Sequence, residues 1–173
     1  MTERVSIVFT AGLLTSLWLL FSPTTAEAGL TFKRLDGSTI GFGAKPRVWC
    51  GPWDDQVARP SIHVSARGPR RGWELTAVRR HIASDALVAF PNAFVSTQPQ
   101  GAQLFVFTPR IEASSAEEES RGSLTFLRAG CQLGEAVEFK VAAVLGSEFF
   151  AGTRVRVSGT YRGFVSAPPE THQ

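Results

Sequence analysis

Two tryptophans and two carboxylates lie close together in one short segment. Flat tryptophan rings can stack on the faces of sugar rings, and neighbouring carboxylates can accept hydrogen bonds from sugar hydroxyls. The sequence therefore offers a candidate ligand-binding site for a carbohydrate, formed by Trp49, Trp53, Asp54 and Asp55. The whole segment reads Trp49-Cys50-Gly51-Pro52-Trp53-Asp54-Asp55.

Two further aromatic residues, Trp73 and Tyr161, could extend this set into a platform of exposed rings. The alternative is that the rings fill the core, because each aromatic side chain buries roughly 150–250 Å² when it is packed inside a domain. Solvent exposure of Trp53 would separate the two interpretations.

The order Trp49-Cys50-Gly51-Pro52 resembles the thioredoxin active-site motif, with Trp53 at the position of the second cysteine. That chemistry needs the second thiol to resolve a mixed disulfide, and it needs a helix that lowers the pKa of the first. Pro60 would end such a helix early. We therefore expect a structural cysteine at a tight Gly-Pro turn.

The sequence predicts no metal site and no cofactor. The three histidines, His63, His81 and His172, are far apart and have no cysteine at ligand spacing. The acidic run Glu117-Glu118-Glu119 would point its carboxylates in different directions, so we expect a solvated turn.

Catalytic motifs are also weak. No Gly-x-Ser-x-Gly sequence is present, and glycosidase chemistry requires two facing carboxylates. Glu112 and Glu148 are the acidic residues that a small exported hydrolase would use, the latter because Phe149 and Phe150 follow it. A binding or structural role is favoured over an enzymatic one.

Basic residues are concentrated between Arg59 and His81, and Arg70-Arg71 lies at a turn flanked by glycine and proline. This cluster could contact an anionic surface, or it could simply keep a hairpin tip soluble. The formal net charge of only +3 does not call for a nucleic-acid partner.

Residues 1–28 have the pattern of a secretory signal peptide. Arg4 precedes an apolar run from Val5 to Phe21, and Ala26-Glu27-Ala28 supplies small residues for cleavage before Gly29. The alternative is an uncleaved anchor, although the run is short for a membrane span. No later segment is apolar enough to span a membrane, so we expect a secreted or periplasmic protein.

Both cysteines, Cys50 and Cys131, fall in the exported part. In an oxidising compartment the simplest expectation is one disulfide between them.

The rest of the chain reads as short apolar runs separated by turns, and the full sequence contains sixteen glycines and ten prolines. This pattern predicts an antiparallel β-sandwich, or a partly open barrel, of about eight or nine strands in one domain over 29–165, followed by a flexible tail over 166–173.

Trp73–Ile82 fits strand or helix and is taken as strand. Ser114–Gly122 is expected to form a helical turn capped by Ser115, and Arg154, Arg156 and Arg162 suggest an edge strand. The expected strands are 30–35, 47–50, 61–67, 73–82, 86–90, 103–108, 123–127, 136–145 and 153–161. A turn at Asp36-Gly37-Ser38 is expected to return the first strand as a hairpin over Thr39–Phe42.

From Gly122 to Phe164 the chain resembles the closing strands of exported bacterial β-sandwich proteins, ending in Val157-Ser158-Gly159-Thr160-Tyr161. The leading hypothesis is a non-enzymatic binding or structural module of the cell envelope, with an envelope protein or polysaccharide as partner. A carbohydrate-binding module and a small exported hydrolase are the alternatives.

Overall fold

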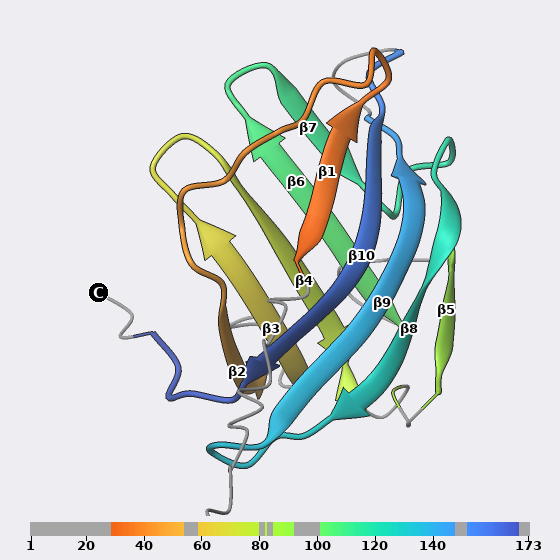
Figure 1. Ribbon diagram of the computed structural model, residues 1–173. Coiled ribbons are helices and arrows are strands. Elements are labelled where there is room, and N and C mark those ends of the chain that lie inside the picture. Colours follow the sequence, from red (N-terminus) through yellow and green to blue (C-terminus); the bar gives the residue numbers. More distant parts are fainter. Residues whose placement is uncertain are drawn as a thin grey trace, which may run out of the picture.

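The computed structural model describes residues 29–53, 59–79, 82, 85–91, 101–147 and 152–169 of the 173-residue chain. These residues form two antiparallel sheets that face each other as a β-sandwich, which confirms the predicted fold class (Figure 1). The ten strands are β1 (Leu30–Arg34), β2 (Arg47–Pro52), β3 (Pro60–Arg67), β4 (Gly72–Val78), β5 (Leu87–Phe90), β6 (Ala102–Thr108), β7 (Ile111–Ser114), β8 (Arg121–Ala129), β9 (Ala136–Leu145) and β10 (Val155–Phe164).

One sheet has the strand order β1-β10-β9-β8-β5 and the other has the order β2-β3-β4-β6-β7. The core lies between them and follows the alternation of each strand. In β3, Ile62 and Val64 are fully buried, while His63 and Ser65 are half-buried on the other face. Phe126 and Phe139 are the largest side chains with no exposed surface.

The sheets are linked at two corners. Val48 in β2 forms a parallel bridge with Val165, which follows β10. The Ser166 N–H donates a hydrogen bond of 2.8 Å to the Val48 carbonyl oxygen. At the other corner Ser114 pairs with Gly146. These links fix the separation of the two sheets at opposite corners.

The helical turn expected over Ser114–Gly122 was wrong. β7 continues to Ser114, turns follow, and β8 begins at Arg121. Ser115 does not cap a helix: its Oγ accepts the N–H of Leu104 in β6 at 2.9 Å. The Ser115 hydroxyl therefore serves as a hydrogen-bond acceptor for a backbone N–H group of a neighbouring strand.

Two other local expectations need correction. The 73–82 segment is a strand, but β4 ends at Val78. The strand with alternating arginines, β10, is not an edge strand, because it lies between β1 and β9. No helix in the described part of the chain is long and apolar enough to cross a membrane.

Candidate functional site

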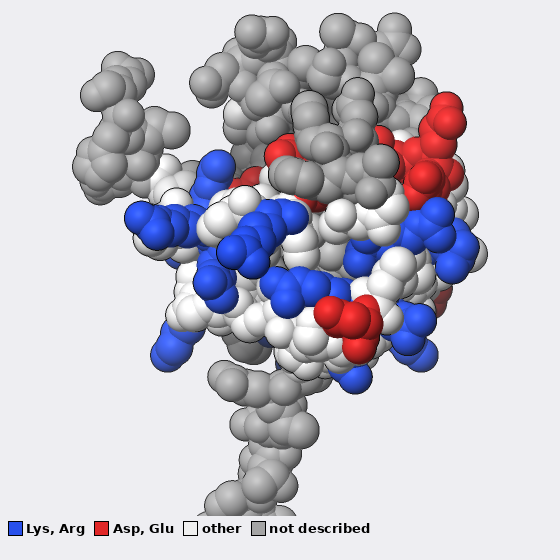
Figure 2. Space-filling model, turned by 90° about the horizontal axis from the view of Figure 1, so that it is seen from above, with Lys and Arg blue, Asp and Glu red and all other residues white. Residues whose placement is uncertain are grey.

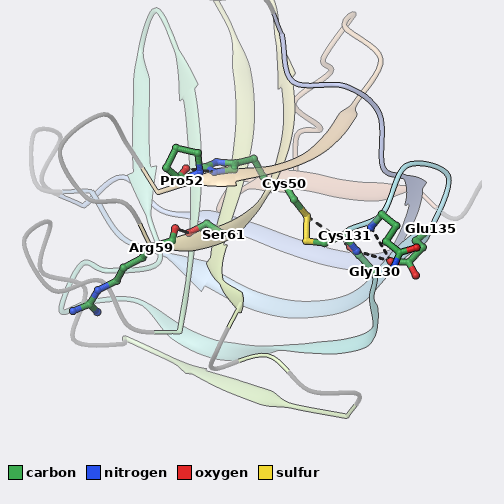
Figure 3. Close-up of a disulfide and its surroundings, with 9 residues drawn as sticks. Cys50, Pro52, Arg59, Ser61, Gly130, Cys131 and Glu135 are labelled. Carbon is green, nitrogen blue, oxygen red and sulfur yellow. Dashed lines mark hydrogen bonds between the residues drawn. A yellow bond between two sulfur atoms is a disulfide. The ribbon is translucent and has the colours of Figure 1, made fainter.

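The predicted disulfide is present. Cys50 at the end of β2 is bonded to Cys131 in the turn between β8 and β9, with 5.6 Å between their Cα atoms (Figure 3). The carboxylate of Glu135 accepts the backbone N–H groups of Cys131 at 2.7 Å and Gln132 at 2.8 Å, and these hydrogen bonds lower its pKa. The disulfide is compatible with an oxidising compartment. It gives Cys50 a structural role, because its sulfur is bonded to Cys131.

Trp49 lies on the outer face of β2, half-buried and stacked on His63 of β3. Their ring centroids are 5.1 Å apart and their planes differ by 7°. His63 Nε2 donates to the Pro52 carbonyl at 2.8 Å, so its Nδ1 accepts from the Thr76 hydroxyl at 3.4 Å. Burial lowers the pKa of His63, and the Trp49 ring therefore rests on a neutral, fixed imidazole.

Of the other predicted platform residues, Trp73 and Tyr161 do not lie on the outer face with Trp49. Trp53 is half-buried, and Asp54 and Asp55 lie outside the described residues. Trp73 and Tyr161 are only 4% and 7% exposed and pack edge to face between the sheets, with ring centroids 5.8 Å apart. These two rings are part of the core.

They also form the floor of a groove that the sequence did not reveal. The groove has a volume of about 1550 Å³ and lies between β1 and β2, on the open side of the sandwich. The connecting segment 39–46 runs along one rim (orange to brown in Figure 1), and β1 with the lower part of β10 forms the other. Ser166 and Val48, which are joined by a backbone hydrogen bond, also line the groove.

Trp73 and Tyr161 each carry a polar group, the indole N–H and the phenol hydroxyl. Within the described residues, neither the Tyr161 hydroxyl nor the Trp73 indole N–H forms a hydrogen bond with the protein. Buried tyrosine and tryptophan side chains usually satisfy these donors. Burial also raises the pKa of Tyr161 to about 12, so its hydroxyl keeps its proton and remains a donor.

Gly163 makes room for this arrangement. A Cβ atom at Gly163 would collide with the Tyr161 hydroxyl and would lie 2.8 Å from Cγ2 of Val48. Because Gly163 follows Tyr161 by two residues in β10, both face the interior. The glycine therefore places the Tyr161 hydroxyl against the groove wall, which Val48 and Gly163 also line.

The rim of the groove is mainly basic. Lys45, Arg47 and Arg162 line it together with a single carboxylate, Glu138. Arg162 Nε is 4.0 Å from a Glu138 oxygen, and the Arg162 guanidinium lies 5.7 Å from the ring centre of Phe164. Phe164 is 59% exposed, so the mouth presents an apolar ring beside positive charge.

Strand lengths leave one backbone edge uncovered beside the groove. β9 pairs with β10 from Val155 to Phe164, whereas β1 pairs only with Val155–Gly159. Within the described residues, no strand pairs with the other edge of Thr160–Phe164. Five residues of strand span roughly 17 Å, and because alternate residues direct their N–H and C=O groups to opposite edges, two or three of them offer these groups beside the groove.

The acidic and histidine residues considered in the sequence do not form a metal-binding cluster in the described ranges. No group of three or more histidine, cysteine, aspartate or glutamate side chains could hold a metal there. In the acidic run, Glu119 instead pairs with Arg154 at 3.0 Å. Glu112 lies in β7, while His81 and Glu148 lie outside the described residues.

Comparison with protein-family models, with curated proteins and with solved structures finds no match to this chain.

Proposed function

We propose that this chain is an exported, non-enzymatic binding module of the cell envelope, and that the groove between β1 and β2 is its recognition site. The observation that carries the proposal is the groove with Trp73 and Tyr161 in its floor, because the Tyr161 hydroxyl and the Trp73 indole N–H form no hydrogen bond within the described residues. A ligand with hydrogen-bond acceptors would satisfy both.

The occupant that suits the groove best is an extended polypeptide segment of an envelope protein. Its carbonyl oxygens would accept from Tyr161 and Trp73, and its backbone could pair with the free edge of Thr160–Phe164. Apolar side chains would fill the aromatic floor. Acidic residues beside the segment would meet Lys45 and Arg47 at the rim.

Two features of the chain support a proposal for its location. We propose that residues 1–28 direct export and that residues 29–165 form the folded module. The Cys50–Cys131 bridge supports an oxidising destination. The mass of the protein recovered from culture would show whether cleavage occurs before Gly29.

Displayed peptides selected on the immobilised full-length protein, then synthesised as fluorescent probes, test the groove. We expect Tyr161→Phe to weaken binding by roughly fivefold, because one hydrogen bond contributes about 1 kcal/mol net. The same variant should unfold at an unchanged or higher temperature, because it removes a buried hydroxyl without a partner.

Trp49→Phe is the matched control, since this ring lies on the outer face of β2. It should leave peptide affinity unchanged. Selection of no peptide, or peptides that bind wild type and Tyr161→Phe equally, would contradict the proposal.

Carbohydrate binding at Trp49 is a second candidate, because stacking on His63 holds that ring in a fixed orientation. Trp53, Asp54 and Asp55 would complete the site. Titration with a panel of envelope polysaccharides, followed by tryptophan fluorescence, distinguishes the candidates. A saturable shift lost in Trp49→Ala and Trp53→Ala but kept in Tyr161→Phe would favour the carbohydrate site over the groove.

A further inference from the structure

A second, smaller pocket lies at the end of the sandwich where three connections meet. It has a volume of about 270 Å³, and its charged lining residues are all arginines. Arg34 ends β1, Arg71 lies in the turn before β4, and Arg110 lies in the turn between β6 and β7. Figure 2 looks onto this end and shows Lys and Arg side chains over much of the described surface, with fewer Asp and Glu among them.

These three guanidinium groups have no carboxylate partner within ion-pair distance in the described part of the chain, unlike Arg67 and Arg154, which pair with Glu74 and Glu119. Arg34 donates to the Ser38 hydroxyl at 3.3 Å, and Arg71 donates to the Gly41 carbonyl at 3.5 Å. Both contacts are exposed, and neither neutralises a charge.

One carboxylate lies near this cluster. Hydrogen bonds from the Ser38 side chain and backbone hold the pKa of Asp36 below its ordinary value, and the charge of Arg34 lowers it further. Asp36 is fully exposed and does not line the pocket. It offsets part of the charge of Arg34, so the pocket retains a net positive charge.

The lining also supplies hydroxyl donors. Thr39 and Thr108 border the pocket with the arginines. Thr108 Oγ1 accepts the backbone N–H of Arg110 at 3.3 Å, which leaves its own proton available to a ligand. Guanidinium forks and hydroxyls around a small cavity match the oxygens of a tetrahedral, doubly charged anion.

We propose that Arg34, Arg71 and Arg110 form a binding site for a phosphate group. The group could belong to a soluble phosphorylated ligand or free phosphate, or to the headgroup of an anionic phospholipid; the chemistry at the pocket is the same. The site shares the segment Thr39–Gly41 with the groove, but its three arginines do not line the groove.

Isothermal titration of the full chain with inorganic phosphate, at an ionic strength held constant with chloride, tests the site. Arg71→Gln and Arg110→Gln should each weaken phosphate binding by about tenfold or more, because each removes a charge-assisted hydrogen bond. Arg71→Lys should give an intermediate loss, because it keeps the charge but not the planar fork. Thermal unfolding of each variant should match wild type.

Arg121→Gln is the matched control, because it removes the same charge from an exposed position that does not line the pocket. It should leave phosphate affinity unchanged. Equal weakening in Arg121→Gln and Arg71→Gln would show a diffuse charge effect and overturn the site. Titration with chloride that reproduces the phosphate signal would also overturn it.

Cosedimentation with phosphatidylcholine vesicles containing phosphatidic acid shows whether the bound phosphate group belongs to a lipid or to a soluble compound. Binding that requires phosphatidic acid and is lost in Arg71→Gln would assign the site to a lipid headgroup. Binding of inorganic phosphate without vesicle binding would assign it to a soluble ligand. Binding of neither would overturn the proposal.

Discussion

Removing the Cys50–Cys131 bridge should cost this domain a large part of its stability. The bonded cysteines are separated by 81 residues. In the chain-entropy model a closed loop of that length stabilises the folded state by about 4.5 kcal/mol at 25 °C, because it restricts the unfolded chain. Both cysteines are only partly buried against the core, so Cys50→Ala with Cys131→Ala should leave little cavity.

The measurement is guanidinium unfolding of the oxidised wild type and of the double alanine variant. We expect a loss of about 4–5 kcal/mol and a larger denaturant dependence in the variant, because its unfolded state is more expanded. Wild type unfolded in the presence of a reductant should behave like the variant. A loss below about 1 kcal/mol, or two reactive thiols in the wild type without reductant, would refute the reasoning.

Three further outcomes follow from individual contacts. Ser120→Ala should cost about 2 kcal/mol in chemical unfolding, because its buried hydroxyl donates to the Ser114 carbonyl at 2.7 Å and accepts the Gly146 N–H at 2.8 Å. Gly163→Ala should cost about 1–3 kcal/mol and weaken any groove ligand, because its methyl group would displace Tyr161. Burial lowers the pKa of His63 below 6.5 in the folded state, so the unfolded chain binds the proton first; stability should fall as pH decreases below 6.5, and His63→Gln should remove that decline.

Side-chain alternation was enough to place most of the strands. The apolar run from Ala136 to Leu145 matches β9 at both ends, and Val155 and Val157 are buried while Arg156 between them is exposed. The disulfide could also be predicted, because the exported part contained only two cysteines. The prediction at Ser115 was wrong because it assumed that the hydroxyl would cap its own turn. The hydroxyl instead accepts a hydrogen bond from Leu104 on β6.

The groove could not be predicted, because alternation shows which side chains face the core and not which strands are neighbours. Trp73 and Tyr161 were grouped with Trp49 by residue type, yet they lie on β4 and β10, on opposite sheets. The free edge at Thr160–Phe164 exists because β1 has five residues and β10 has ten, and only their register shows which half remains uncovered. A site made from unequal strand lengths and a buried hydroxyl without a partner leaves no motif in the sequence. Substitutions at Tyr161 and Gly163 are therefore the most direct test of what this fold binds.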